Sequence, residues 1–223
     1  MVEVHRVVPD PRHPLAALIE LVERPEDFEE LLALRAMTDP IAADALERIS
    51  LVAPANRYTG RRASIVMAPF LYIGPSRFSP GTFGVLYTAD SLLVAIRESG
   101  YHAARYLEAT HMTAPASVPR YALELTLDDR DHFDIRIGGA HDVHDPRIYD
   151  CRAYDAAQAL GARMREDGHQ GVWYNSVRAT GGTCYGTFRP VAVVDVGETA
   201  HELELVWDGS AITQYREITT HSL

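Results

Sequence analysis

The chain has 223 residues, of which 47% are hydrophobic and 23% charged, and its formal net charge is −10 at pH 7. This length and composition allow a substantial buried core, which excludes intrinsic disorder and favours one globular domain with an appendage. The negative charge excludes nucleic acid as a bulk electrostatic partner, although a few arginines can still hold a small anion in one cleft.

The N-terminal stretch is not expected to act as an export signal. The N-terminal stretch MVEVHRVVPDPRHP lacks the charged-then-apolar layout of a signal peptide, and no apolar run approaches the length that spans a bilayer. Cys151 and Cys184 lie in neither a CxxC nor a CxxH cluster, so we expect two reduced thiols. These features favour a cytoplasmic protein with no membrane partner.

The first quarter of the chain has a helical pattern. From Pro14 to about Val52, apolar residues recur three and four positions apart. Within this segment a helix is predicted over TDPIAADALERISLV, beginning at Thr38 or Asp39. We therefore expect an N-terminal helical extension over residues 1–55.

The character of the sequence changes from residue 56. The stretch RYTGRRASIVMAPFLYIGPSR mixes Gly, Pro and Arg with short apolar runs, as a strand–loop region does. FGVLYTA then has the composition and length of a strand. Asp90 is the expected N-cap of the following helix, SLLVAIRESGYHAARYL.

Strands dominate the remainder. RYALELTLDD alternates and predicts a half-buried strand from about Pro119 to Leu127, with which FDIRI is expected to pair. DAAQALGARMRED predicts a helix ended by Gly168, and further strands are predicted in GVWYNSV, VAVVDV, LELVW and ITQYREI. Helices followed mostly by strands indicate an α+β fold with a mixed or antiparallel sheet, and a doubly wound fold fits badly.

Glu98 lies on an otherwise apolar helical segment. It shares a stripe with Ala95, His102 and Tyr106, because these residues are three and four positions apart. A carboxylate in such a stripe is a candidate for a ligand site. A solvated glutamate on the helix surface is the alternative that the pattern leaves open.

Three further residues are candidates for the same site. Arg77 lies in the loop before the strand FGVLYTA, and its planar guanidinium group is suited to a diphosphate. Tyr87 shares a strand face with Phe83 and Val85, where core packing is the alternative. Ser176 ends GVWYNSV and precedes a glycine-bearing loop, but it lacks the GxSxG turn of a nucleophile.

The other motifs predict less. HDVHD, residues 141–145, has residue types that bind metals, but it has neither HExxH spacing nor an obvious third ligand. GGTCYG lacks the spacing of a phosphate loop. No metal site is therefore predicted.

Together these residues resemble the RES domain family, which is named for its Arg, Glu and Ser. SRFSPGTFGVLYTADSLLVAIRESGYH and GARMREDGHQGVWYNSVRATGGTCYGTFRP carry the resemblance, which covers roughly residues 57–196. Arg77, Tyr87, Glu98 and Ser176 match the family's active-site positions. Many members have Gly-Arg-Trp-Asn where this chain has Ser-Arg-Phe-Ser, so the contacts of that Trp and Asn differ here.

The resemblance implies a fold similar to the ADP-ribosyltransferases of the diphtheria-toxin type, with residues 56–223 as the RES domain. It implies a type II toxin that consumes NAD⁺ as a substrate, without a prosthetic group, and whose partner is an Xre-type helix-turn-helix antitoxin. By the same resemblance Glu98 stabilises the ribosyl cation and Arg77 holds the diphosphate. Tyr87 orients the nicotinamide end, and Ser176 positions the ribose or the nicotinamide.

Several alternatives remain open at this level. Water as the acceptor makes the protein a glycohydrolase, and inorganic phosphate makes it a phosphorylase. Arg57 and Arg178 are candidates to bind that phosphate or NAD⁺. A protein side chain as the acceptor makes the protein an ADP-ribosyltransferase, and a non-catalytic nucleotide-binding module is the alternative outside enzymes. A homodimer and a hetero-oligomer with the antitoxin are both compatible with the sequence.

Overall fold

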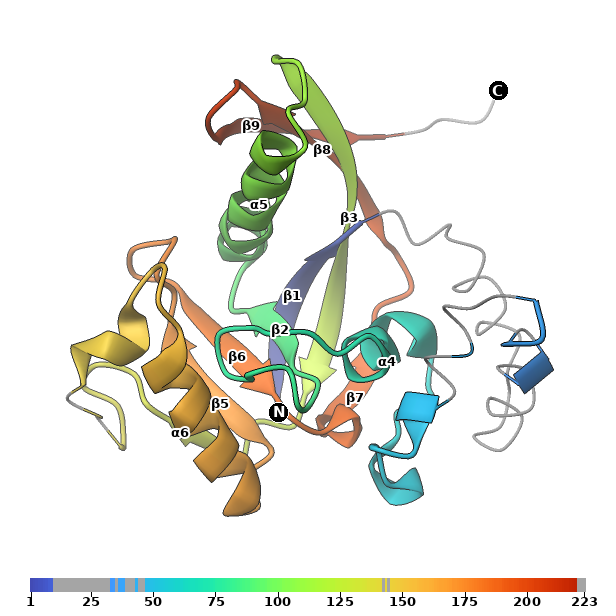
Figure 1. The fold of residues 1–223 in the computed structure, drawn as a ribbon, viewed down its shortest axis with the longest axis vertical. Coiled ribbons are helices and arrows are strands. Elements are labelled where there is room, and N and C mark those ends of the chain that lie inside the picture. Colours follow the sequence, from blue (N-terminus) through green and yellow to red (C-terminus); the bar gives the residue numbers. More distant parts are fainter. Residues whose placement is uncertain are drawn as a thin grey trace.

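The computed structural model describes residues 1–9, 33–34, 36–38, 43, 47–141, 143 and 145–219. Within them a nine-stranded mixed sheet is combined with helices, which confirms the predicted α+β class (Figure 1). In the described part of the chain, no helix has both the length and the apolar character to cross a bilayer.

The sheet is largely antiparallel. Its strands are β1 (Val2–Val8), β2 (Leu86–Ala89), β3 (Ala116–Leu127), β4 (His132–Asp134), β5 (Gly171–Asn175), β6 (Thr183–Thr187), β7 (Val193–Val196), β8 (His201–Trp207) and β9 (Ile212–Ile218). Their order is β4-β5-β6-β2-β1-β3-β8-β9, and β7 also pairs with β3. The pair β4–β5 is parallel, so the sheet is mixed.

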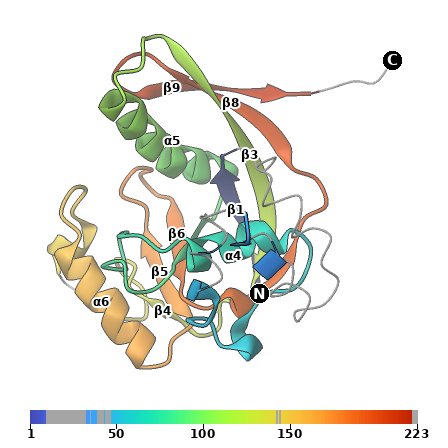
Figure 2. The same ribbon diagram turned by 45° about the vertical axis from the view of Figure 1, so that its right-hand side comes forward.

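Helices lie on both faces of this sheet. They are α4 (Ala63–Leu71), α5 (Leu92–Ala109) and α6 (Asp155–Glu166), and short 3-10 turns cover Pro54–Asn56, Pro146–Tyr149 and Pro190–Ala192. Figures 1 and 2 show α5 beside β8 and β9, and α6 beside β5.

Alternate residues of each strand assign the helices to their faces. On β3, Leu123 clusters with Phe70 of α4, whereas Ala122 clusters with Ile96 of α5. On β6, Cys184 belongs to the cluster that contains Leu160 of α6. Because neighbouring residues of a strand point to opposite faces, α4 covers one face and α5 and α6 cover the other.

The structure differs from the predicted N-terminal extension at its start. Val2–Val8 forms β1, which pairs with β3 along seven residues and lies in the interior of the sheet. The remainder of the predicted extension lies mostly outside the described residues, although residues 47–49 are helical. An alternating seven-residue segment becomes a central strand only when its distant partners are present, and β3 is more than 100 residues away.

Two further predictions are wrong. The expected strand–loop region contains the helix α4, six of whose nine residues are buried, because a short apolar run does not distinguish a buried helix from a strand. The segment FDIRI does not pair with β3; its first residues belong to β4, which pairs in parallel with β5. The two edges of β3 are instead paired with β1 and β8.

The start of α5 also differs by one residue. Ser91, and not Asp90, is the N-cap, and its hydroxyl accepts a hydrogen bond from Val94 N. Asp90 instead accepts hydrogen bonds from the backbone N and the hydroxyl of Thr183 on β6. These contacts fix the beginning of α5 against the sheet. The end of α6 follows the prediction, since Gly168 has a φ of +92° just beyond it.

Candidate active site

A pocket of about 450 Å³ lies between α5, the C-terminal half of β1 and β2. Its volume is in the range of small-molecule sites. Arg77, Tyr87 and Glu98 all line it, although they come from a loop, a strand and a helix. The fold therefore brings three of the four predicted active-site residues to one cavity.

Glu98 reaches the pocket because of the helical stripe on α5. Ala95, His102 and Tyr106 line the same cavity, as their spacing predicts. Burial is the main cause that lowers the pKa of His102, and the nearby Glu98 opposes that shift. His102 is therefore the neutral neighbour of the carboxylate at pH 7.

Ser176 joins the site through Glu98. Its Oγ donates a hydrogen bond of 2.6 Å to Glu98 Oε1. Ser176 Oγ in turn accepts hydrogen bonds from the backbone N of Arg178 and of Ala179, at 3.1 and 2.9 Å. Because the Ser176 oxygen accepts two backbone hydrogen bonds, its own proton points toward the Glu98 carboxylate.

Arg77 is almost fully buried, with 8% of its surface exposed. Its Nη1 donates to the backbone oxygens of Ile148 and Asp150, and its guanidinium carbon lies 4.7 Å from the centre of the Tyr154 ring. These contacts use one nitrogen of the planar fork. Among the described residues no further hydrogen bond involves this side chain, so Nε and Nη2 are available to an anion.

Tyr87 is held at its hydroxyl. The hydroxyl accepts a hydrogen bond from Phe78 N at 3.0 Å and donates one to Ser76 Oγ at 2.9 Å. Burial raises the pKa of Tyr87 to about 12, so the phenol is neutral at physiological pH. With the hydroxyl occupied, the aromatic ring is the part that can contact a ligand.

The remaining two candidates lie elsewhere. Arg57 donates to the backbone oxygens of Val52 and Ile49 and does not line the pocket. Arg178 lines a second groove, on the other flank of α5, where it lies over the Tyr101 ring. The placement gives neither guanidinium group direct access to the pocket.

Sequence reasoning missed the contribution of β1 and β3. Arg6 and Arg120 line the pocket together with Thr88 of β2. The Nε atoms of both arginines and the Thr88 hydroxyl are buried and have no hydrogen-bond partner in the described part of the chain. Buried polar atoms of this kind are costly unless they are satisfied, so they are candidates to contact a bound ligand. No local pattern identifies Arg6, because alternation groups it with Val4 and Val8, which belong to the core cluster that contains Phe70 of α4.

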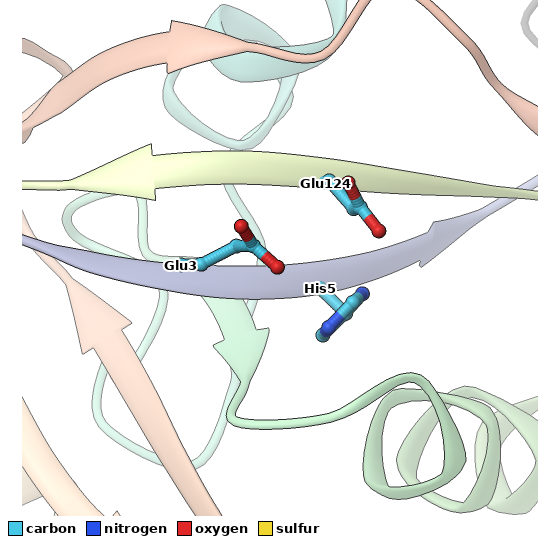
Figure 3. Close-up of side chains that lie close together, drawn as sticks. All are labelled: Glu3, His5 and Glu124. Atoms are coloured by element: carbon cyan, nitrogen blue, oxygen red, sulfur yellow. The ribbon is translucent and has the colours of Figure 1, made fainter.

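One group of three side chains on β1 and β3 has the residue types that bind a metal ion (Figure 3). His5 is directly opposite Glu124 in the strand register, and Glu3 is two residues from His5 on the same strand face. Their ligand atoms lie within 4.8 Å of one another. Exposed glutamates often adopt this arrangement without an ion, and none of the three is among the four predicted active-site residues.

The family model of the RES domain matches residues 45–208, a segment that includes Arg77, Tyr87, Glu98 and Ser176. No curated protein matches the chain.

Proposed function

The chain belongs to the RES domain family, and from this premise we propose that it cleaves the nicotinamide–ribose bond of NAD⁺ in the pocket beside α5. The observation that carries the proposal is the hydrogen bond between Ser176 and Glu98, which links two family positions 78 residues apart at a pocket that Arg77 and Tyr87 also line.

Glu98 is the proposed catalytic residue. Breaking the bond between ribose and nicotinamide develops positive charge on the ribose, as in the oxocarbenium-like states of glycoside hydrolysis. A carboxylate beside the ribose stabilises that charge and accepts hydrogen bonds from its hydroxyls. Nicotinamide leaves as a neutral molecule, so the site has to position and stabilise the substrate rather than protonate the leaving group.

Ser176 is a positioning residue in this proposal. Because its hydroxyl is held by two backbone N–H groups, it fixes one oxygen of Glu98 and leaves the other for the ribose. This role differs from the direct contact with ribose or nicotinamide that the family resemblance implied.

The substrate's diphosphate is assigned to the arginines. Arg77 has two nitrogens without hydrogen bonds to described residues. The buried Nε atoms of Arg6 and Arg120 also have no acceptor among the described residues, and a phosphate oxygen would supply one. A planar guanidinium group can donate two parallel hydrogen bonds to a phosphate. The ring of Tyr87 is then assigned to stack on the nicotinamide end, since its hydroxyl is already bonded.

The biological role follows from the reaction as part of the same proposal. Loss of NAD⁺ is toxic to the cell that makes the protein, so we infer a toxin of a type II toxin–antitoxin system acting in the cytoplasm. The partner proposed from the family is an Xre-type helix-turn-helix antitoxin. Water or inorganic phosphate is the proposed acceptor.

The test is a time course of purified protein with NAD⁺, with and without inorganic phosphate, resolved by chromatography and mass. Wild-type protein should release nicotinamide. Glu98→Gln should lower kcat by about 10²–10³-fold, because the amide cannot neutralise the cation. Glu166→Gln, an exposed glutamate at the end of α6, is the matched control and should keep full activity.

The products decide the acceptor. Free ADP-ribose identifies water, and ADP-ribose 1″-phosphate formed only with added phosphate identifies phosphate. Label transferred from NAD⁺ to a protein would replace the proposal by ADP-ribosylation. Full activity of Glu98→Gln would refute the role of Glu98, and NAD⁺ that binds but is never cleaved would indicate a non-catalytic module.

A further inference from the structure

A second groove of about 850 Å³ lies on the other flank of α5, between that helix and the turn and strand that contain Ser210–Tyr215. The residues of α5 that line it include Arg97, Tyr101 and Arg105, which recur every four positions. Glu98 and His102 are each one residue further along and line the active-site pocket. One helix therefore separates two distinct cavities.

Four arginines surround this groove. Arg97 and Arg105 come from α5, and Arg152 and Arg178 come from two loops. Within the described residues none of the four forms an ion pair, and Glu108 is the one acidic side chain among the lining residues. The groove therefore concentrates uncompensated positive charge.

This charge stands out in an acidic chain. The formal net charge is −10, and five arginines elsewhere on the described surface are paired with carboxylates: Arg61 with Glu198, Arg130 with Asp128, Arg136 with Asp134, Arg147 with Asp145 and Arg216 with Glu204. The exposed Arg163 and Arg165 of α6 also form no ion pair with described residues, but they do not share a cavity with other unpaired arginines of α5. In the groove, four arginines without an ion pair among the described residues line one cavity, and this concentration points to an external anionic partner.

The arginines are partly preorganised. Arg178 lies 3.5 Å from the centre of the Tyr101 ring and donates to the backbone oxygen of Cys151 at 2.6 Å. Arg105 approaches the same ring at 5.9 Å. Stacking on an aromatic ring restricts a guanidinium group while leaving its N–H edge free, so less entropy is lost when a carboxylate binds.

The wall opposite α5 favours a peptide. It is formed by β9 and its preceding turn, and β9 is the last strand in the sheet order. Among the described residues β9 pairs only with β8, so its outer edge presents unpaired backbone groups. An extended segment can add to such an edge by backbone hydrogen bonds, while its side chains meet the arginines.

We propose that the groove between α5 and β9 binds an acidic peptide segment of a partner protein. Carboxylates at alternate positions of the segment pair with the arginines, and the segment's backbone follows β9. A long nucleic acid fits less well, because the acidic chain around the groove repels a polyanion that extends beyond it. The proposal concerns a surface separate from the active-site pocket, so it does not depend on NAD⁺ cleavage.

The test measures binding of a fluorescein-labelled octaglutamate peptide to the full-length protein by fluorescence anisotropy at low and physiological salt. Wild-type protein should bind it, and an octaglutamine peptide should not bind. The double variant Arg97→Gln/Arg105→Gln should weaken binding by about 10-fold or more, since two charge-assisted contacts are lost. The control Arg130→Gln/Arg147→Gln removes the same net charge from paired surface arginines and should change binding less than about twofold.

Three results would overturn the proposal. Equal weakening in both double variants would show a general effect of charge. Unchanged binding in the groove variant would place the peptide elsewhere. A single-stranded RNA octamer that displaces the peptide at lower concentration than unlabelled octaglutamate would reassign the groove to nucleic acid. NAD⁺ cleavage is measured in parallel. Because peptide binding is measured without NAD⁺, a protein that does not cleave NAD⁺ would still give an interpretable binding result.

Discussion

At the scale of single residues, the proposed site depends on the contact between Ser176 and Glu98. The hydroxyl has a hydrogen bond of 2.6 Å to the carboxylate and is itself fixed by the backbone N atoms of Arg178 and Ala179. A carboxylate fixed in this way does not have to reorient when positive charge develops on the substrate, so it can stabilise the transition state. The serine thus contributes to the proposed reaction without contacting the reacting atoms.

Replacing this hydroxyl should affect turnover more than substrate binding. Ser176→Ala removes a hydrogen bond to a charged group, so we expect kcat to fall by roughly 10–100-fold while KM changes less than about threefold. Ser176→Thr, which keeps a hydroxyl, should recover part of the loss. Steady-state kinetics of nicotinamide release measures both parameters.

The control for this variant is Ser50→Ala, which removes an exposed hydroxyl that donates to Glu47 O. Thermal melting checks that each variant is folded. A Ser176→Ala protein that melts like the wild type and keeps its kcat would contradict the positioning role, as would a loss confined to KM.

At the scale of elements, α6 supports the loop that carries Arg77. Gly161 of α6 faces the backbone of Phe78, and a Cβ atom at this glycine would lie 2.1 Å from Phe78 O. Gln158 of the same helix donates to Ser76 O at 3.0 Å. The loop is therefore held on α6 by a close backbone approach that only glycine allows.

Gly161→Ala should therefore destabilise the protein. The added methyl group has to displace the helix or the loop, which costs about 1–3 kcal/mol and corresponds to a fall in Tm of roughly 3–10 °C for a chain of this size. Gly74→Ala is the matched control, because a Cβ at Gly74 meets no atom within 4 Å. Differential scanning calorimetry of both variants gives the comparison, and equal melting temperatures would show that α6 and the loop are not tightly packed.

At the scale of the whole molecule, a buried histidine couples the stability of the sheet to pH. His132 on β4 is 9% exposed, its Nε2 lies 3.0 Å from Thr187 Oγ1 on β6, and its Nδ1 is buried without a partner among the described residues. Burial lowers its pKa from 6.5 to about 4, although the nearby Asp129 and Asp128 oppose that shift. The folded protein therefore holds this ring neutral.

The sign of the effect follows from proton uptake. Between pH 6.5 and 4 the unfolded chain protonates this histidine and the folded chain does not, so the free energy of unfolding falls as the pH falls. The stabilisation is fully present above pH 6.5. Between pH 6.5 and 4 the free energy of unfolding falls by at most about 1.4 kcal/mol for each pH unit. Burial lowers the pKa of His102 as well, which adds in the same direction.

We expect urea unfolding at pH 7.5 and pH 5.0 to show this loss for the wild type. His132→Gln, which keeps a group able to bond Thr187, should show a smaller difference between the two pH values. The carboxylates whose pKa is lowered by neighbouring arginines, such as Asp134, lose their contribution only at lower pH. An identical pH dependence in the wild type and the variant would assign the effect to other groups.

Much of the fold followed from local patterns. The stripe of Ala95, Glu98, His102 and Tyr106 predicted a shared helix face, and these side chains do line one pocket. The alternation in β3 and the glycine beyond α6 were likewise readable, because both depend on residues close in sequence. The short helix α4 could not be predicted, since its apolar run fits a strand equally well.

By itself, the sequence determined the α+β class, the order of Arg77, Tyr87, Glu98 and Ser176, and the family to which they belong. Tertiary structure alone decided that β1 enters the sheet between β2 and β3, that Ser176 donates to Glu98, and that Arg178 lies in a second groove. The physical reason is the distance along the chain between the interacting residues. Periodicity reports which face a residue occupies on its own element, whereas pairing and side-chain direction depend on partners about 80 to 120 positions away.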